Sequence, residues 1–571
     1  MSGTKPQTAH LRKTNNVWEL VVDGKPFTVL GAELQNSSMS SAYYMDEVWQ
    51  NVKNMGINTV LGNICWEDIE PEEDRFDFNE MDKMIASAES YGLRMIILWF
   101  GSFKNGMSCY VPSWVKRNAK RFPRQQCRTQ DGLRRPQNVL SLLHEENVRA
   151  DCKAFRALMQ HLKEMDEHKT VIMVQVENEV GLLGDSRDGS RTADKLFNSS
   201  VPQELVEFLA TAWDTLLPEL KKNIPHFYEM CQKSEGPPSG HWEELFGRSY
   251  HTDELFQAYH YAHYVEKVAA AGREVYETIP LFTNAWLPKP GTGAGLGNFA
   301  SGGNHPGQYP SGGPVNTVLD VWYRFTPTLD FISPDIYSSD YEKTCRDYTY
   351  HGRPLFIPEQ RRDAHGARRV WEALGSFQAL GACPFGIDTL AAEDFDYTKH
   401  FRLLQRVSTH IQKARVQPDT IFGFYIDEPD SSVLDAAGVS IIKRFREFEL
   451  HISPAFVLGK YQSGYGMIIE LDVGRYLLIG EGYKVEFKST SPTSVFTGMA
   501  KTHELSVPDP KDGVFRKERT LNGDETRSGA WINMPNEKPD YGEGYIPVTI
   551  PARTKIAQTE IYSLGPEDIV N

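Results

Sequence analysis

The chain has 571 residues, a formal net charge of -15 at pH 7, and 40% hydrophobic and 24% charged residues, which is ordinary for a globular enzyme. Its length exceeds what one hydrophobic core usually supports, so we expect a large domain and at least one smaller one. The acidic balance argues against nucleic acid or an anionic membrane as a partner, because both are bound by clustered Lys and Arg.

Cysteine usage and the N-terminus bear on the compartment. The seven cysteines have no paired short spacing, which fits a reducing environment better than a disulfide framework. The first twenty residues lack the apolar segment of a signal peptide, and no run of 18 apolar residues occurs. We therefore expect a cytoplasmic protein with no membrane association. Two N-x-S sequons, at Asn36 and Asn198, leave secretion by another route open, and homo-oligomerisation is also left open.

Short apolar runs alternate with helix-period segments through the first 400 residues or so, the pattern of βα units around a parallel sheet. The eight runs are 27–33, 58–63, 94–101, 171–181, 280–286, 330–337, 354–360 and 384–390. Eight such units predict an α/β fold, a (β/α)₈ TIM barrel whose functional residues lie at the C-terminal ends of the strands. A doubly wound open sheet is the alternative, because counting strands does not prove closure.

The sequence changes character after the predicted helix at 398–414. In the segment 483–489, Val485 and Phe487 alternate with charged residues, which is typical of antiparallel strands with one face in solvent. We therefore predict a catalytic barrel over residues 1–414 and a β-rich, sandwich-like accessory domain over 415–571.

Two glutamates stand at the ends of predicted strands, Glu179 after the fourth and Glu359 after the seventh. In a closed barrel these ends face each other across the mouth, and two carboxyls about 5 Å apart are the arrangement for retaining glycoside hydrolysis. The alternatives are a surface salt bridge for Glu179, and pairing of Glu359 with Arg361 or Arg362. A neighbouring arginine would also keep a nucleophile ionised.

The segment QVENEVG, residues 175–181, resembles the Q-[IV]-E-N-E-[YV]-G signature of glycoside hydrolase family 35, the β-galactosidases with (β/α)₈ barrels. GINTVLGNICWEDIEPEEDRFDF, from residue 56, resembles that family's second-strand segment. LWFGSFKNGMSCYVPSWVK and GQYPSGGPV resemble a subgroup closer to family 42, with a small β-rich C-terminal domain. The resemblance implies a retaining exo-β-glycosidase, foremost a β-galactosidase. It makes Glu179 the acid/base, Asn178 the contact of the sugar 2-hydroxyl, Glu359 the nucleophile and Glu177 a structural neighbour.

The chain departs from family 35 at its first and third strands, which read GAELQNS and LWFGSFKNG. Typical members have a Ser-Ile-His-Tyr-like first strand and a Cys-Ala-Glu-Trp-like third strand, whose acidic residue holds sugar hydroxyls. We therefore expect β-glycoside cleavage more strongly than galactose recognition. Glu33, Lys104 and Asn105 are the candidates to replace the missing contacts.

Aromatic residues supply further candidates. Tyr337 ends the sixth predicted strand, where it donates a hydrogen bond to the nucleophile or lies at the edge of the core. One of Trp66, Trp99 and Trp286 is expected to stack on a sugar, although each ring alone is more typical of packing. Tyr309 is the candidate aglycone contact within the glycine-rich segment 290–315.

No cofactor and no catalytic metal are expected. The glycines of segment 290–315 form neither G-x-G-x-x-G nor a Walker motif, and LLHEENV, from residue 142, lacks the second histidine of H-E-x-x-H. The expected partner is a carbohydrate substrate, a β-galactoside or related oligosaccharide. Two competing hypotheses are a β-glucosidase-type or transglycosylating enzyme on the same site, and a non-catalytic carbohydrate-binding barrel.

Overall fold

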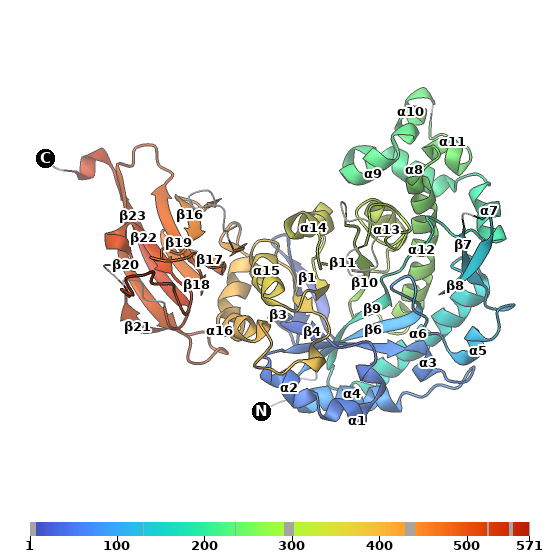
Figure 1. The fold of residues 1–571 in the computed structure, drawn as a ribbon, viewed down its shortest axis with the longest axis horizontal. Coiled ribbons are helices and arrows are strands. Elements are labelled where there is room, and N and C mark those ends of the chain that lie inside the picture. Colours follow the sequence, from blue (N-terminus) through green and yellow to red (C-terminus); the bar gives the residue numbers. More distant parts are fainter. Residues whose placement is uncertain are drawn as a thin grey trace.

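The computed structural model describes residues 7–129, 131–234, 236–289, 302–428, 440–521, 523, 525–547 and 552–569. The chain forms a TIM-barrel-like domain followed by a β-rich domain at one end of the long axis (Figure 1). Within the described residues, no helix combines the length and the apolar character that crossing a membrane requires.

The barrel contains eight parallel strands in the part of the chain that the structure describes. Six form one sheet in the order β11-β10-β9-β6-β5-β4, and β12 pairs with β13. A bridge from Ile336 to Gln360 joins β12 to one edge of the six-stranded sheet, and a bridge from Glu33 to Phe385 joins the region of β13 to the other. The strands thus close into a ring, against the open-sheet alternative. The strand bounds are β4 (Gly31–Glu33), β5 (Thr59–Cys65), β6 (Arg94–Lys104), β9 (Val171–Asn178), β10 (Leu281–Trp286), β11 (Phe331–Asp335), β12 (Ile357–Gln360) and β13 (Ala382–Pro384).

Strand composition explains where the core lies. Every residue of β5 and β9 is buried, as expected of strands covered on both faces. Inside the ring the aromatic side chains of Phe282, Phe331 and Phe356 pack against one another. A small antiparallel sheet of β1 (His10–Thr14), β2 (Val17–Val22) and β3 (Lys25–Phe27) adds Leu20 and Val22 to this inner cluster. The carboxyl ends of the strands are left to form the site.

Helices cover the outside of the ring, each with one apolar stripe. In α4, Met81, Met84, Ile85 and Ala88 are buried at spacings of three and four. In the described residues between β9 and α12, five inserted helices stand above the barrel, at the upper right of Figure 1. The helices are α1 (Ala42–Asp46), α2 (Trp49–Asn54), α3 (Trp66–Ile69), α4 (Asn79–Ser90), α5 (Ser113–Lys116), α6 (Glu145–Met165), α7 (Arg191–Phe197), α8 (Gln203–Ala212), α9 (Pro218–Asn223), α10 (Pro225–Lys233), α11 (Trp242–Phe246), α12 (Tyr250–Arg273), α13 (Leu319–Phe325), α14 (Tyr341–Tyr348), α15 (Ala364–Gly375) and α16 (Tyr397–Arg415).

The eighth strand lies earlier than the sequence predicted. The prediction placed it at 384–390, whereas β13 ends at Pro384 and residues 387–389 form a 3₁₀ turn. Gly386 has a left-handed backbone with φ of 74°, which ends the strand. The apolar residues Ile387 and Leu390, beyond this glycine, therefore extended the strand prediction by a few positions too far.

The C-terminal domain is a sandwich of two antiparallel sheets, with strand orders β14-β17-β18-β23-β20-β21 and β15-β16-β19-β22. Phe424, Leu450, Ile468 and Val485 belong to the core between them. The strands are β14 (Ile421–Ile426), β15 (Ile441–Arg444), β16 (Phe448–Pro454), β17 (Gly464–Asp472), β18 (Arg475–Glu481), β19 (Tyr483–Ser489), β20 (Phe496–Ser506), β21 (Arg516–Thr520), β22 (Trp531–Met534) and β23 (Ile556–Leu564). A two-stranded ribbon, β7 (Arg124–Arg128) with β8 (Arg134–Leu140), belongs to the barrel domain.

The two domains meet where the larger C-terminal sheet packs on α15 and α16 (Figure 1). The backbones approach each other closely at Gly375 and Gly423, because a Cβ atom on Gly375 would lie 2.5 Å from the Gly423 nitrogen. Ser376 Oγ donates a hydrogen bond to the Gly423 carbonyl oxygen at 2.5 Å. The predicted boundary between residues 414 and 415 falls at the end of α16 and stays a prediction.

Candidate active site

A bulge in β6 places Lys104 in the mouth of the barrel. Trp99 aligns with Val176 of β9, but the next aligned pair is Lys104 with Asn178, so β6 has three extra residues there. Such a bulge redirects a side chain. The Lys104 side chain is buried, and its Nζ donates a hydrogen bond to Asn178 Oδ1 at 2.8 Å.

Glu177 holds this bulge together. Its carboxylate accepts hydrogen bonds from the backbone N–H groups of Phe103 at 2.7 Å and Ser102 at 3.3 Å. Asp151 of α6 also accepts from the Ser102 N–H. Burial, followed by the nearby Asp151, raises the pKa of Glu177 well above its usual value. Glu177 thus supports the backbone of the bulge, which agrees with the structural role expected for it.

Glu179 follows β9 directly and is 7% exposed. Its backbone is left-handed, with φ of 45°, and its N–H donates to Asn284 Oδ1 at 2.8 Å. A non-glycine residue in this conformation is uncommon and is often found at functional sites. Burial and the neighbouring Glu359 raise the pKa of Glu179 to about 7, against the opposing effect of Lys104. A carboxyl with such a pKa can hold a proton near neutral pH and release it.

Glu359 lies on β12 and is 5% exposed. The hydroxyl of Tyr337 donates a hydrogen bond to its Oε2 at 2.8 Å, in line with one of the two predicted roles of this tyrosine. The predicted arginine partners point elsewhere: Arg361 pairs with Asp363, and Arg362 donates to the Gly386 carbonyl oxygen. The alternative of an arginine salt bridge to Glu359 is therefore wrong, and the nearby cation is Lys104.

A third carboxylate joins the two predicted ones. Oxygens of Glu179, Asp335 and Glu359 all lie within 4.8 Å of one another. Asp335 ends β11 and accepts a hydrogen bond from Asn284 Nδ2 at 2.7 Å. This spacing would suit a metal ion, but it equally suits two catalytic carboxyls, Glu179 and Glu359, with Asp335 beside them. The positive charge of Lys104 lies close enough to affect the pKa of both Glu33 and Glu179.

Glu33 lies at the end of β4, almost fully buried. Burial, then the charge of Glu359, raises its pKa well above the usual range. For Lys104, burial alone would lower the pKa, but the carboxylates of Glu359, Glu179 and Glu33 outweigh it and the pKa is raised. The mouth therefore combines one ammonium group with several carboxyls.

Several buried polar atoms around the mouth have no hydrogen-bond partner among the described residues. They are Glu33 Oε2, Asn178 Nδ2, Trp286 Nε1, Asp335 Oδ1 and Glu359 Oε1. Buried polar groups normally have partners, and an unpaired set at a cavity mouth is what a bound polar molecule would satisfy. Both donors and acceptors are present, which suits a ligand rich in hydroxyl groups.

The structure corrects two of the three tryptophan candidates. Trp66 and Trp99 are completely buried in the outer core, where their Nε1 atoms donate to Glu70 at 2.7 Å and to Asp151 at 3.0 Å. Neither ring has a surface left for a sugar, because both side chains point toward the surrounding helices. Trp286 is partly exposed at the end of β10 and stays the candidate for stacking.

Asn105 lies beside the site through its backbone, since its N–H donates to the Asn178 carbonyl oxygen at 3.1 Å. Its side-chain Oδ1 accepts from the Ser108 N–H and so caps a turn. Asn105 therefore shapes the loop after β6, and direct contact with a sugar stays a prediction.

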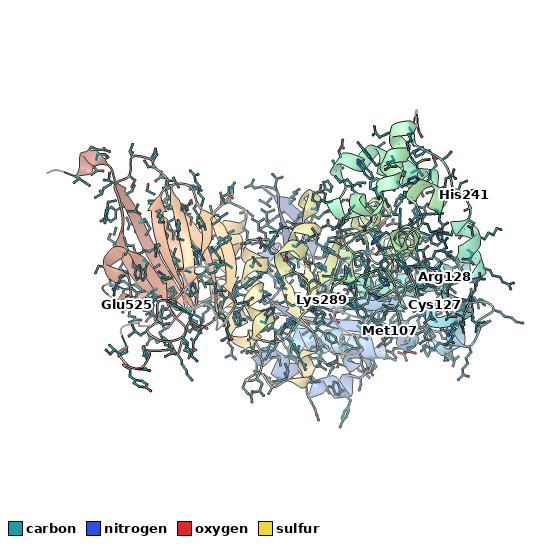
Figure 2. All side chains as sticks on the ribbon, turned by 45° about the horizontal axis from the view of Figure 1, so that its top comes forward. Met107, Cys127, Arg128, His241, Lys289 and Glu525 are labelled. Atoms are coloured by element: carbon teal, nitrogen blue, oxygen red, sulfur yellow. The ribbon has the colours of Figure 1, made fainter. Side chains whose placement is uncertain are left out.

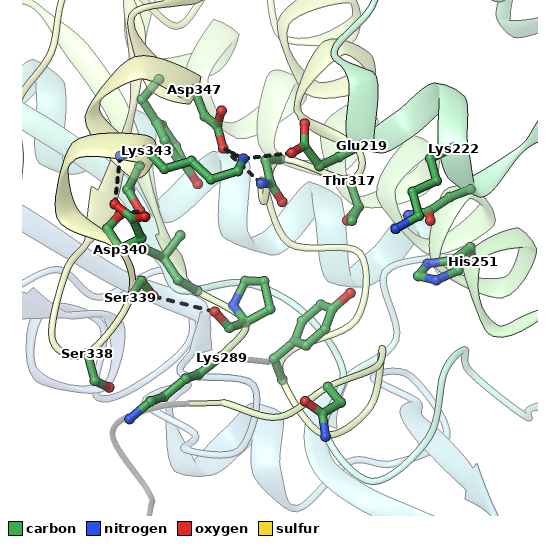
Figure 3. A pocket seen from close by; sticks show the side chains of 18 residues that line it. Glu219, Lys222, His251, Lys289, Thr317, Ser338, Ser339, Asp340, Lys343 and Asp347 are labelled. Atoms are coloured by element: carbon green, nitrogen blue, oxygen red, sulfur yellow. Dashed lines mark hydrogen bonds and ion pairs between the residues drawn. The ribbon is translucent and has the colours of Figure 1, made fainter. Parts of the chain in front are cut away.

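A cavity of about 550 Å³ borders the mouth (Figure 3). Residues 287–289, after β10, and residues 338–340, after Tyr337, line it on one side, with Glu219 and Lys222 of the inserted helices on another. Lys343 spans the wall in ion pairs with Glu219 and Asp347, at 2.6 and 2.8 Å. Lys289 marks this region near the middle of the long axis, far from Glu525 of the C-terminal domain (Figure 2).

Tyr309 lines the same cavity, and its hydroxyl donates to Glu254 Oε1 of α12 at 2.9 Å. Its ring is buried, so it shapes the cavity wall, and contact with an aglycone stays a prediction. Much of the glycine-rich segment, residues 290–301, lies outside the described residues.

The sequence analysis missed Asn284 and Asp335. Both lie at the C-terminal ends of barrel strands, in the segments FTNAW and SPDIY, so reading the last polar residue of every strand would have found them. Their pairing with Glu179 depends on the closeness of β9, β10 and β11, which no sequence pattern gives.

Residues 36–223 match the model of glycoside hydrolase family 42, described as beta-galactosidase. Residues 397–533, from the start of α16, match a domain of unknown function (DUF5597). A curated beta-galactosidase of Xanthomonas manihotis is 30% identical over 82 residues, only 14% of this chain and 14% of that protein. The matches support a glycoside hydrolase related to β-galactosidases. They are to family 42, and the expected family 35 is not supported.

Solved structures give only weak similarity. The beta-galactosidase from Bacillus circulans sp. alkalophilus is 14% identical, with 68% of this chain and 57% of that chain covered and a TM-score of 0.43. The beta-galactosidase from Marinomonas ef1 is 14% identical, with 68% of this chain and 61% of that chain covered and a TM-score of 0.42. The catalytic domain of beta-amylase from Paenibacillus polymyxa is 12% identical, with 64% of this chain and 94% of that chain covered and a TM-score of 0.43. The chain thus spans less than two thirds of these β-galactosidases, and the TM-scores do not distinguish one activity from another.

Proposed function

We propose that the chain is a retaining exo-β-glycosidase that hydrolyses terminal, non-reducing β-galactosides through a covalent glycosyl-enzyme. The observation that carries this proposal is the approach of the Glu179 and Glu359 carboxylate oxygens to within 4.8 Å at the ends of β9 and β12. A separation of about 5 Å is that of a nucleophile and an acid/base, whereas inverting enzymes need more room for a water molecule.

In the first step, Glu359 attacks the anomeric carbon while Glu179 gives its proton to the leaving glycosidic oxygen. The pKa of Glu179, about 7, suits a general acid near neutral pH. The Tyr337 hydroxyl donates a hydrogen bond to Oε2 of Glu359, and the charge of Lys104 lies nearby, so both groups face the carboxyl that attacks.

In the second step, Glu179 accepts a proton from water as the water oxygen bonds to the anomeric carbon and the bond to Glu359 breaks. Asn178 is the proposed contact of the sugar 2-hydroxyl, since its buried Nδ2 is unpaired and Lys104 fixes its orientation by binding Oδ1. An amide held in this way presents a donor toward the substrate.

The assignment to galactose rests on the family match of residues 36–223. The cavity beyond Trp286 and Tyr337 is the proposed place of the aglycone, because residues 287–289 and 338–340, which directly follow these two residues in the chain, line one side of it. The proposed organisation is a catalytic domain over 1–414 and an accessory domain over 415–571.

The proposal is tested by incubating the protein with 2,4-dinitrophenyl 2-deoxy-2-fluoro-β-galactoside and locating the label by peptide mass spectrometry. Label on Glu359 is expected, with none on the Glu359→Gln variant. Label from the gluco analogue alone would keep the mechanism and change the sugar. Failure of both reagents to label the protein would overturn the proposed mechanism.

A further inference from the structure

Asp335 is a buried carboxyl next to the proposed acid/base, and the mechanism above gives it no role. It ends β11 and is 3% exposed. Its Oδ2 accepts from Asn284 Nδ2 at 2.7 Å, whereas Oδ1 receives no hydrogen bond from an N–H or O–H donor of the described residues. A buried carboxylate oxygen without a donor is costly unless a proton satisfies it.

Asn284 ties Asp335 to Glu179. The amide oxygen of Asn284 accepts the backbone N–H of Glu179 at 2.8 Å, so its NH₂ group must point the other way, to Asp335. Because β10 lies between β9 and β11 in the sheet, one side chain spans the two strand ends. The position of the Asp335 carboxyl relative to Glu179 is therefore fixed by a single rigid amide.

The surroundings of Asp335 favour a neutral carboxyl. The charged and titratable groups near it are the carboxyls of Glu33, Glu179 and Glu359, the ammonium group of Lys104, and the hydroxyls of Tyr337 and Tyr348. Burial, then the negative charges of Glu359 and Glu179, raises the pKa of Asp335 well above its usual range. Oxygens of Asp335 and Glu179 lie within 4.8 Å of each other, and two neighbouring carboxyls can share a hydrogen bond only if a proton lies between them.

We propose that Asp335 is a positioning residue that remains protonated and donates a hydrogen bond to the Glu179 carboxylate. This inference rests on the proposed function. In the second step Glu179 must be ionised to take a proton from water, and a neutral donor beside it stabilises and orients that form. The proton on Asp335 does not leave: the proton of water goes to Glu179, the water oxygen bonds to the anomeric carbon, and the bond to Glu359 breaks.

Two variants separate a donor from a charge. In Asp335→Asn the amide oxygen can still accept from Asn284 and the NH₂ group can still donate to Glu179. We therefore expect kcat and KM for 2,4-dinitrophenyl β-galactoside close to wild type, and the alkaline limb of kcat/KM for an unactivated disaccharide at the same pH as in wild type. Asp335→Ala removes the donor, and we expect kcat to fall about tenfold, the effect of one hydrogen bond to a charged group.

Two further readouts distinguish positioning from a merely structural role. In Asp335→Ala, KM should fall together with kcat, because slow second-step hydrolysis lets the glycosyl-enzyme accumulate. For an unactivated disaccharide, whose leaving group needs a proton, the alkaline limb of kcat/KM should move to higher pH, because Glu179 loses a donor that lowers its pKa. Thermal unfolding of both variants checks that each is folded. If Asp335→Ala is not folded, the kinetics of Asp335→Asn alone test the proposal.

Several outcomes would overturn the proposal. Loss of activity in Asp335→Asn equal to that in Asp335→Ala would show that the charge is needed. Wild-type kinetics in Asp335→Ala would show that the hydrogen-bond donor is not needed. Infrared difference spectra at neutral pH provide a readout without turnover: wild type should show the C=O band of a protonated carboxylic acid that Asp335→Asn lacks. The absence of that band refutes a protonated Asp335 even if no glycoside is cleaved, whereas failure of fluoro-sugar labelling refutes the proposed function alone.

Discussion

Lys104 Nζ and Asn178 Oδ1 lie 2.8 Å apart, and this hydrogen bond connects the bulge of β6 to the residue that precedes the proposed acid/base. The lysine side chain is buried, yet neighbouring carboxylates raise its pKa, so it stays charged. One side chain thus orients Asn178, the proposed sugar contact, and supplies positive charge to the carboxylates.

Replacing this lysine should weaken both functions. In Lys104→Met, kcat/KM is expected to fall by roughly 100-fold, as when a charge that stabilises a developing charge is removed. The alkaline limb of kcat/KM should move to higher pH, because Lys104 lowers the pKa of Glu179. Lys83→Met, on the exposed face of α4, is the matched control and should behave as wild type. A pH profile unchanged in Lys104→Met would show that the lysine does not act on Glu179.

Glu179→Gln should separate the two chemical steps. Without its proton donor, the enzyme should lose activity on unactivated disaccharides by about 10²–10⁴-fold, the usual contribution of a general acid. Formation of the glycosyl-enzyme from 2,4-dinitrophenyl β-galactoside should be largely spared, because this leaving group needs no proton. Burst kinetics measure the first step directly, and full activity on lactose-type substrates would contradict the assignment.

The strand-end glutamates could be predicted from the sequence because local patterns carry them. A largely apolar run that leads into Glu177, Asn178 and Glu179 marks a buried strand with polar groups at its carboxyl end, and the structure has both. Tyr337 and Glu359 follow from the same logic. Ring closure did not follow from it, since closure depends on bridges such as Glu33 to Phe385, more than 300 residues apart in sequence.

The predictions that were wrong concern the direction in which side chains point. Trp66 directly follows β5 as predicted, whereas Trp99 lies within β6 and not at its end, and their rings turn outward to Glu70 and Asp151. The sequence gives the alternation of a regular strand, and a three-residue bulge in β6 breaks that alternation just after Trp99. Tertiary pairing therefore decided which residues face the mouth.

The pH dependence of stability should report the burial of Glu179. Its pKa of about 7 lies above the value of 4.5 for an ordinary glutamate, so the folded protein holds this proton more tightly than the unfolded chain does. Stability from this group is present below pH 4.5 and is lost as pH rises to 7, by about 3 kcal/mol for a shift of this size. Glu179→Gln should therefore be more stable than wild type at pH 8, with a smaller difference at pH 5. Urea unfolding at both pH values tests this, and an equal difference at both would contradict it.

Glu177→Ala should impair catalysis through Lys104. The Phe103 N–H would lose its acceptor, at a cost of about 1–3 kcal/mol for a buried unpaired group, while the Ser102 N–H would keep Asp151, and the bulge would relax. Activity should fall and the alkaline limb should move to higher pH, as in Lys104→Met. In the double variant the two losses should not add, because both act through one side chain. Fully additive effects would show that Glu177 acts independently of Lys104.

Gly423→Ala should destabilise the contact between the two domains. A Cβ at this position would lie 1.9 Å from the backbone oxygen of Trp371, an atom of helix α15 that cannot move without displacing the helix. Overpacking of this kind costs about 1–3 kcal/mol, so the melting temperature should fall while KM for aryl galactosides stays unchanged. Gly236→Ala is the control, because a Cβ there meets no atom within 4 Å. A melting temperature of Gly423→Ala equal to that of Gly236→Ala would show that the sheet and α15 can separate without loss of stability.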